Sequence, residues 1–241
     1  MRQTDAIQLR RRPSAWASLV AGSAVIVVGG ALIIGVWWAA TREERISSYA
    51  VSGSLNGVTL DLGDADADIV GGGQHPSVNV SRTDRSAFGR HAVAERDVSG
   101  GVLRIRSRCP SSVLGSCSAS YRLTVPDNVP VTVRTGAGNV RFDRYKGSAR
   151  IDTTGGDIAV NGFCGFALQA RAESGTVRAA ASCAPERMEL RSATGDVRAV
   201  VPPGRYRVDA DSDAGRRTVE GVTAADDAPF SIQALSGNGD V

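Results

Sequence analysis

Apolar and polar residues alternate along short segments of this chain, and these segments follow one another over most of its length. A typical pair is Ile158 and Val160, two residues apart and flanked by polar or small residues. A period of two is that of a β-strand with one buried face. The same alternation occurs at residues 57–62, 102–108 and 121–126. Outside residues 15–40, no segment has a helical period, so we predict an all-β fold.

A glycine turn recurs between the alternating segments. The matching glycines are Gly138, Gly156, Gly175 and Gly195, spaced by 18, 19 and 20 residues, with a clipped copy at Gly239. A fixed period near twenty predicts a β-solenoid of stacked two-strand coils, with a period of about 18–20 residues. Turn geometry alone accounts for the glycine and aspartate of this motif, so it does not indicate an active site.

Each predicted coil has a second corner about nine residues after the first. These corners lie at Gly147, Gly165, Ala184–Pro185, Gly204 and Ala228–Pro229. The inward pairs expected on the last two coils are Tyr206/Val208 and Phe230/Ile232. The stretch from residue 215 to 239 is the poorest match, because it runs 24 residues and places Arg217 where an apolar residue is expected.

Residues 15–40 form an apolar run without a charged residue. As a helix the run would be roughly 39 Å long, which is enough to span a bilayer with some tilt. Arginines precede the run, which places the N-terminus in the cytoplasm. We therefore expect a cytoplasmic basic tail at 1–14, a single transmembrane helix at 15–40 and a polar tether at 41–50. An extracytoplasmic β-strand-repeat domain would occupy residues 51–241. A cleaved signal peptide is the rival interpretation, but its apolar region would be too long.

Within the expected domain, residues 81–98 are polar and charged and predict a loop with one weak strand. The formal net charge of +3 comes from four arginines and one aspartate in residues 1–14. The rest of the chain is neutral, which argues against nucleic-acid binding. All three tryptophans, Trp16, Trp37 and Trp38, lie in or beside the apolar run, which weakens a sugar-binding interpretation.

The four cysteines are Cys109, Cys117, Cys164 and Cys183. Cys164 and Cys183 each lie eight residues after a repeat glycine, so they fall at the same position of consecutive coils. Stacked strands lie about 4.8 Å apart, close to the Cα separation of a disulfide. We predict Cys164–Cys183 as a link between coils and Cys109–Cys117 as the closure of a loop. A metal site is the alternative, but the chain lacks a CxxC motif.

Two sets of charged residues are candidate ligand sites. Asp64, Asp66 and Asp68 alternate with alanines and could hold Ca²⁺. They do not fit an EF-hand loop, and a solvated strand face is the favoured interpretation. Arg178, Arg198 and Arg141 fall at outward positions of stacked coils. They could meet an anionic wall polymer or lipid headgroups, although pairing with neighbouring aspartates is the commoner arrangement. No catalytic, cofactor-binding or metal-ligating residue is assigned.

The spaced motifs resemble a known family. They are Leu60–Gly72, Tyr121–Gly138, TTGGDIAV at Thr153, SATGDV at Ser192 and SGNGDV at Ser236. With the N-terminal apolar run, they resemble the bacterial "putative adhesin" β-strand-repeat family, a domain-of-unknown-function family. The resemblance covers most of residues 51–241 and implies a membrane-anchored extracytoplasmic β-solenoid. It identifies no catalytic residue, and the turn signature is degraded at residues 173–177 and 212–219.

Three functions are open to such a protein. The first is a non-enzymatic, membrane-tethered envelope or adhesin-like protein that binds a cell-wall polymer or an envelope protein of unknown identity. The second is an accessory of an envelope-stress sensing system, which would need a partner because fourteen cytoplasmic residues hold no output domain. The third is a solenoid carbohydrate-active enzyme, which the lack of tryptophan and of a distinctive carboxylate motif disfavours. We expect no enzymatic activity and leave the oligomeric state open.

Overall fold

The computed structural model describes residues 43–73, 76–87, 90–110 and 116–241. The predicted cytoplasmic tail at 1–14 and the predicted transmembrane helix at 15–40 lie outside the described residues. Within the described ranges, no helix is long and apolar enough to cross a membrane. Residues 43–241 form one structural unit.

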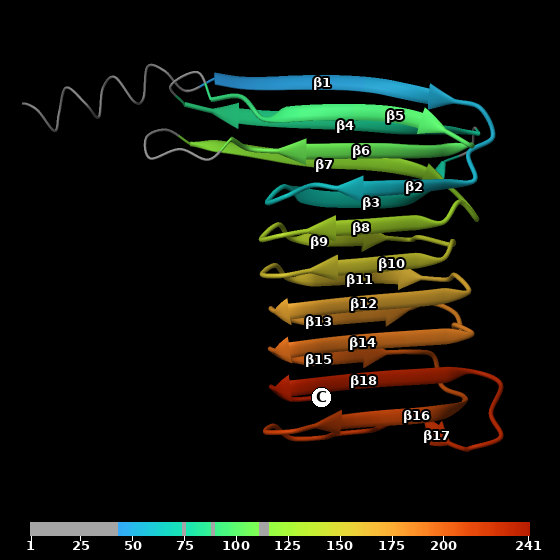
Figure 1. Ribbon diagram of the computed structural model, residues 1–241. Coiled ribbons are helices and arrows are strands. Elements are labelled where there is room, and N and C mark those ends of the chain that lie inside the picture. Colours follow the sequence, from blue (N-terminus) through green and yellow to red (C-terminus); the bar gives the residue numbers. More distant parts are fainter. Residues whose placement is uncertain (1–42, 74–75, 88–89, 111–115) are drawn as a thin grey trace, which may run out of the picture. The chain divides into compact units, whose positions relative to one another are not determined.

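This unit consists of two sheets that face each other (Figure 1). The eight-stranded sheet contains, in spatial order, β1 (Glu43–Ser52), β4 (Ser77–Ser86), β7 (Cys117–Pro126), β3 (Asp66–Gly73), β9 (Val140–Asp143), β11 (Ile158–Phe163), β13 (Val177–Ala181) and β15 (Val197–Val200). The ten-stranded sheet contains β17 (Thr223–Ala224), β16 (Arg205–Ser212), β18 (Ser231–Asn238), β14 (Arg187–Thr194), β12 (Ala167–Ser174), β10 (Ala149–Thr153), β8 (Val131–Thr135), β2 (Gly57–Asp61), β6 (Val102–Arg108) and β5 (Val93–Ser99).

The chain alternates between the two sheets from β8 to β15, and each passage forms one coil of two strands (Figure 1). Strands of successive coils pair in parallel, with Ile158 opposite Val140 on one side and Val177 on the other. The prediction of an all-β fold is confirmed. Because residues of one register position face the same way, the alternation in the sequence becomes continuous rows of side chains along the stack.

The core lies between the sheets and is built from these inward rows. Ile151, Ile158, Leu168 and Leu190 are each at most 1% exposed. Burial of one such side chain contributes about 1.5–3 kcal/mol. A single coil is too thin to enclose its own apolar residues, so each depends on the coils next to it.

Two predictions for the N-terminal part of this unit were wrong. Residues 43–50, expected within a polar tether, form most of β1, which pairs antiparallel with β4 over its whole length. Residues 81–98, expected as a loop with one weak strand, belong largely to β4 and β5. Both β1 and β5 are mostly exposed, and backbone hydrogen bonds to a neighbouring strand hold them. These two strands form without alternating apolar residues, so the hydrophobic pattern of the sequence could not reveal them.

The C-terminal coils do not stack in chain order. β18 lies between β14 and β16, so the last strand of the chain is inserted before the strand that precedes it (Figure 1). The inward residues of β18 are Ile232 and Ala234, and those of β16 are Tyr206, Val208 and Ala210, so the predicted Tyr206, Val208 and Ile232 face inward. The predicted Phe230 precedes β18, and its ring lies 6.1 Å from that of Tyr206. The turn after β18 carries the Gly239–Asp240 signature that stacks on the Gly195 turn, whereas the turn after β16 has Gly215–Arg216 instead.

Candidate functional site

The repeat glycines form one column along the stack. A Cβ atom on Gly156 would collide with the carbonyl oxygen of Gly138, and one on Gly175 would meet the carbonyl oxygen of Gly156 at 2.6 Å. The column continues through Gly195 to Gly239, which takes the place that chain order would give to Gly215. Successive turns approach so closely that no side chain fits between their backbones. The predicted turn glycines are therefore packing positions.

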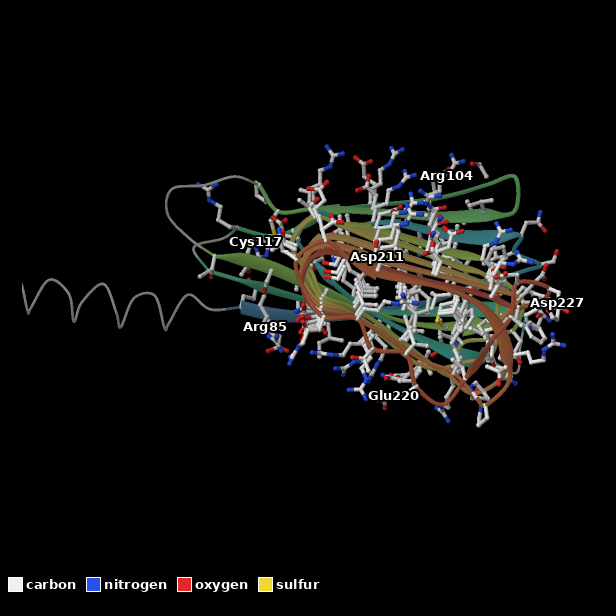
Figure 2. The ribbon with its side chains drawn as sticks, turned by 90° about the horizontal axis from the view of Figure 1, so that it is seen from below. Arg85, Arg104, Cys117, Asp211, Glu220 and Asp227 are labelled. Carbon is white, nitrogen blue, oxygen red and sulfur yellow. A yellow bond between two sulfur atoms is a disulfide. The ribbon has the colours of Figure 1, made fainter. Side chains whose placement is uncertain are left out.

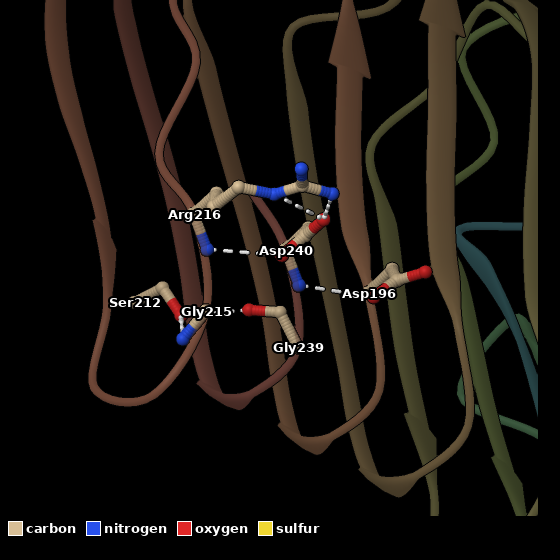
Figure 3. A network of polar contacts seen from close by, with 6 residues as sticks. All are labelled: Asp196, Ser212, Gly215, Arg216, Gly239 and Asp240. Atoms are coloured by element: carbon tan, nitrogen blue, oxygen red, sulfur yellow. Dashed lines mark hydrogen bonds and ion pairs between the residues drawn. The ribbon is translucent and has the colours of Figure 1, made fainter.

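Hydroxyl side chains next to this column connect successive turns. Ser192 Oγ donates to the carbonyl of Gly175 at 2.7 Å, and Ser236 Oγ donates to that of Gly195 at 2.9 Å. In the last turn, Ser212 Oγ donates to the carbonyl of Gly239 and accepts the N–H of Gly215, both at 2.7 Å (Figure 3). These hydroxyls satisfy backbone groups, and those of Ser192 and Ser236 are buried.

The aspartates of the turn motif accept backbone N–H groups from the neighbouring coil. Asp157 Oδ1 accepts the N–H of Thr176 at 2.7 Å, and Asp196 Oδ1 accepts that of Asp240 at 2.9 Å (Figure 3). Asp240 in turn accepts the N–H of Arg216 and pairs with its guanidinium at 2.8 Å. Hydrogen bonds from Arg216 lower the pKa of Asp240 below its ordinary value.

Of the three alternating aspartates considered for Ca²⁺, two are occupied in the same way and the third forms an ion pair. Asp66 Oδ1 accepts the N–H of Asn139 at 2.8 Å, Asp64 accepts that of Ala137 at 3.2 Å, and Asp68 pairs with Arg122 at 2.7 Å. Among the residues that the structure describes, no group of three acidic, histidine or cysteine side chains could hold a metal ion. The expected solvated strand face therefore holds carboxylates that cap the next turn.

Both disulfides have the predicted connectivity. Cys164 and Cys183 are joined across adjacent coils with a Cα separation of 5.1 Å, and Cys109 joins Cys117 with a Cα separation of 5.8 Å. Neither pair leaves a free thiol among the described cysteines.

The outer face of the ten-stranded sheet carries both charge signs in pairs. A groove of about 680 Å³ crosses its strands. Arg150 pairs with Asp152 at 3.0 Å, Arg171 lies 3.9 Å from Glu189, and Arg191 donates to Gln233. Viewed along the stack, Arg104 lies on this side of the unit and Glu220 on the opposite side (Figure 2). The groove itself is lined by charges of both signs, Arg134, Arg171 and Arg191 with Asp152, Glu173, Asp211 and Asp213, so it presents no field of one sign.

The outer face of the eight-stranded sheet differs in its C-terminal half, where three arginines have no ion-pair partner among the described residues, whereas Arg122 on β7 pairs with Asp68. Arg141, Arg178 and Arg198, which we call the arginine row, occupy one register position on β9, β13 and β15, and β11 contributes Ala159 between them. All three are exposed, and none forms an ion pair within the described part of the chain. The pairing with neighbouring aspartates that we considered commoner does not occur, since those carboxylates hold turn N–H groups.

Ala159 opens a groove between two members of the row. The groove has a volume of about 670 Å³, and Arg141 and Arg178 line it on either side of Ala159. Arg122, Asp66, Asp68 and Asp157 line it as well. Their strands are two steps apart, so their Cα atoms are roughly 10 Å from each other. At that spacing, two guanidinium groups can bracket one phosphate or carboxylate group and donate hydrogen bonds from both sides.

One arrangement that the sequence did not reveal superficially resembles a catalytic triad. Ser86 Oγ lies 3.1 Å from His91 Nδ1, and His91 Nε2 lies 3.8 Å from Glu43 Oε2. Ser86 is only 5% exposed, and neither it nor His91 lines one of the main cavities of the described residues. A nucleophile needs access to substrate, so we assign these contacts to the packing of β4 against the segment that follows it.

Comparison with known proteins identifies one matching family and several solved structures of similar fold. The family described as Toastrack DUF4097 matches residues 116–238. A "putative cell adhesion protein" from Clostridium sporogenes ATCC 15579 is 10% identical, covering 82% of this chain and 97% of its own, with a TM-score of 0.48. A "putative adhesin" from Parabacteroides merdae ATCC 43184 is 11% identical, covering 82% and 96%, with a TM-score of 0.41. No curated protein matches the chain.

Proposed function

The chain belongs to the Toastrack DUF4097 family, and on this premise we propose that it is a membrane-anchored, non-enzymatic binding protein of the cell envelope. Its ligand would be an anionic surface polymer bearing phosphate or carboxylate groups. The observation that carries this proposal is the arginine row, whose exposed guanidinium groups have no acidic partner in the described residues. The family match agrees with the resemblance found from the repeats.

The row suits a linear polymer better than a small anion. Its members repeat along the stack at intervals of one or two strand spacings, about 5 and 10 Å. A polymer lying across the strands would meet several guanidinium groups in succession, and weak contacts made together give a much higher overall affinity. The groove over Ala159 provides space for one anionic group between Arg141 and Arg178.

The location outside the cytoplasm is part of the same proposal. The apolar run at 15–40 supports a membrane anchor, and the arginines before it support a cytoplasmic N-terminus. The two disulfides fit an oxidising compartment. An adhesin-like role is expected if the polymer belongs to a surface that the protein contacts.

A charge-reversal experiment tests the arginine row. We expect Arg141→Glu/Arg178→Glu to weaken binding of the purified chain to immobilised poly(glycerol phosphate) by about tenfold or more, measured by biolayer interferometry at 50 and 300 mM salt. Wild-type affinity should fall as salt rises, because the contacts are exposed ion pairs. Dextran, a neutral polymer, should not bind.

The matched control is Arg104→Glu/Arg106→Glu, which makes the same change in net charge on the opposite sheet. We expect this control to change the affinity by less than about twofold. Equal losses in both variants would mean that only net charge matters, and the assignment of the ligand to the arginine row would then be wrong. Absence of wild-type binding to phosphate-bearing and carboxylate-bearing polymers would overturn the proposed ligand class.

A further inference from the structure

A corner groove lies on the side of the stack where the Cys164–Cys183 disulfide links two coils. It has a volume of about 610 Å³, and the disulfide lines it. Two phenylalanines line it as well, of which Phe166 is 63% exposed and Phe230 is partly buried. Glu186 lines the groove with them and is exposed. The turn contacts described above involve none of these last three side chains.

The strand ladder places these three side chains next to one another. Phe166, Glu186 and Phe230 immediately precede β12, β14 and β18, and β14 lies between the other two strands. Arg187 donates its N–H to the carbonyl of Phe166 at 3.1 Å, and Ser231 donates to that of Glu186 at 3.0 Å. The backbone pairing therefore extends to the corner, and Glu186 stands between the two phenylalanines.

The spacing of the two phenylalanines suits a cation. Strands two steps apart have Cα atoms roughly 10 Å from each other, so a group over Glu186 lies about 5 Å from the strand of either phenylalanine. The attraction between a cation and an aromatic ring acts within about 6 Å of the ring centroid. Two rings and one carboxylate can therefore contact a single cation in the groove.

The charges of the lining favour a cation as well. The carboxylate of Glu186 forms no ion pair or hydrogen bond with another described residue. Asp127 pairs with Lys146 through Oδ2 at 3.1 Å, while its Oδ1 is buried without a hydrogen-bond partner in the described part of the chain. Arg187 follows Glu186 but does not line the groove. The lining thus holds two carboxylates and one ammonium group, and a bound cation would balance them.

Two further contacts hold the site in shape. The disulfide begins two residues before Phe166 and ends three residues before Glu186, so it fixes the separation of their two corners. On the side of Phe230 that faces away from Glu186, its ring packs against Tyr206, with ring centroids 6.1 Å apart. A site that is already in place lowers the entropy cost of binding.

A methylated ammonium group fits this site better than a metal ion or a primary ammonium. A metal ion such as Ca²⁺ needs six or more oxygen ligands. A primary ammonium loses strong hydrogen bonds to water when it enters a groove beside phenyl rings. Methyl groups on the nitrogen contact the rings, while the positive charge is kept.

We propose that the corner groove binds a methylated ammonium group of a soluble ligand between Phe166 and Phe230, with Glu186 as the counter-ion. The two rings supply cation–π contacts, and the carboxylate supplies the opposite charge. The site shares no residue with the groove over Ala159, and the proposal does not depend on the polymer-binding function.

Choline and its neutral isostere 3,3-dimethyl-1-butanol test the proposal. The two molecules have nearly the same shape, and only choline carries a charge. The full chain, purified in a maltoside detergent and titrated by saturation-transfer NMR, should bind choline at least about tenfold more tightly than the isostere. Tetramethylammonium should displace choline, whereas potassium ions at the same concentration should not.

Three variants identify the residues that bind. Glu186→Gln removes only the charge, so it should weaken choline binding at least about threefold and leave binding of the isostere unchanged. Phe166→Leu keeps an apolar side chain without an aromatic face and should also weaken choline binding at least about threefold. The matched control Glu173→Gln removes an exposed carboxylate outside the groove and should leave choline binding unchanged. All three positions are exposed, and equal urea midpoints would show that the variants are folded.

Phosphatidylcholine vesicles distinguish a soluble ligand from a lipid headgroup. We expect the vesicles not to compete with choline, because Phe166 by itself gives little anchorage at a bilayer surface. Competition by the vesicles would overturn the soluble source and assign the site to a lipid headgroup.

Three other results would overturn the site itself. Equal binding of choline and its isostere would mean that the groove recognises apolar shape only. Equal weakening by Glu186→Gln and Glu173→Gln would mean that only the net charge of the chain matters. Displacement of choline by potassium ions as effective as that by tetramethylammonium would reduce Glu186 to an ordinary surface carboxylate with its counter-ion.

Discussion

At Gly156 the neighbouring coil is so close that there is no room for a single Cβ atom. A Cβ atom there would overlap the carbonyl oxygen of Gly138, whereas a Cβ on the adjacent Gly155 would have no neighbour closer than 3.8 Å. The two glycines stand side by side in the sequence GGD, yet only one lies in the column. The need for glycine at position 156 comes from the distance between coils.

We expect Gly156→Ala to lower the free energy of unfolding by about 1–3 kcal/mol, because the coils must move apart to admit the methyl group. Gly155→Ala should change it by less than about 0.5 kcal/mol. Urea unfolding of both variants, followed by far-ultraviolet circular dichroism, makes the comparison. An equal decrease in the free energy of unfolding of both variants would show that close packing of the repeat glycines does not restrict position 156.

Tyr145 links stability to alkaline pH. Its ring is buried against Phe142 and Phe163, and its hydroxyl donates to the carbonyl groups of Val129 and Ser148. Burial raises the pKa of Tyr145 well above its ordinary value of 10.0. The unfolded chain therefore releases this proton at a lower pH than the folded chain. The contribution is complete below about pH 10 and is lost as pH rises toward the folded-state pKa.

We therefore expect Tyr145→Phe to reduce stability by about 1 kcal/mol at pH 7, because two carbonyl groups lose a donor. Its stability should then decline less steeply than that of the wild type between pH 9.5 and 11.5. Urea titrations across this range measure both effects. The other tyrosines are present in both proteins, so parallel pH profiles would exclude Tyr145 as the source of the difference.

At the scale of elements, the position of β18 gives a prediction of its own. β18 has a strand on each side, whereas β16 pairs on its outer side only with the two residues of β17. Amide protons of β18 should therefore exchange more slowly than those of β16, although β18 is nearer the end of the chain. Peptide-level hydrogen exchange with mass spectrometry can compare them. Faster exchange in β18 would contradict its insertion between β14 and β16.

At the scale of the whole molecule, residues 1–42 should decide where the protein resides. The full chain should sediment with membranes, resist extraction by alkaline carbonate and be released by detergent, because the apolar run at 15–40 is long enough to span a bilayer. A chain that starts at Glu43 behind a cleavable export signal, in place of residues 1–42, should be released from membranes. Immunoblotting of the membrane and soluble fractions measures the distribution of each chain. If alkaline carbonate released the full chain from membranes, a spanning anchor would be ruled out.

The sequence by itself determined the all-β class, the coil period, the inward rows from β8 to β15 and both disulfides. These features depend on local spacing, since a period of two selects a buried face and a period near twenty places equivalent residues on top of one another. The same reasoning placed Arg141, Arg178 and Arg198 on outward positions of stacked coils.

Only the tertiary structure decided which of those residues were free to bind. Asp157 and Asp196 were possible partners for the arginine row, but they hold N–H groups of the neighbouring coil instead. The insertion of β18 was also beyond the reach of the sequence, because both β16 and β18 carry suitable apolar pairs. In the folded protein the Gly239–Asp240 turn stacks on Gly195 and the Gly215 turn stacks on Gly239, and these backbone contacts exist only once the coils are assembled.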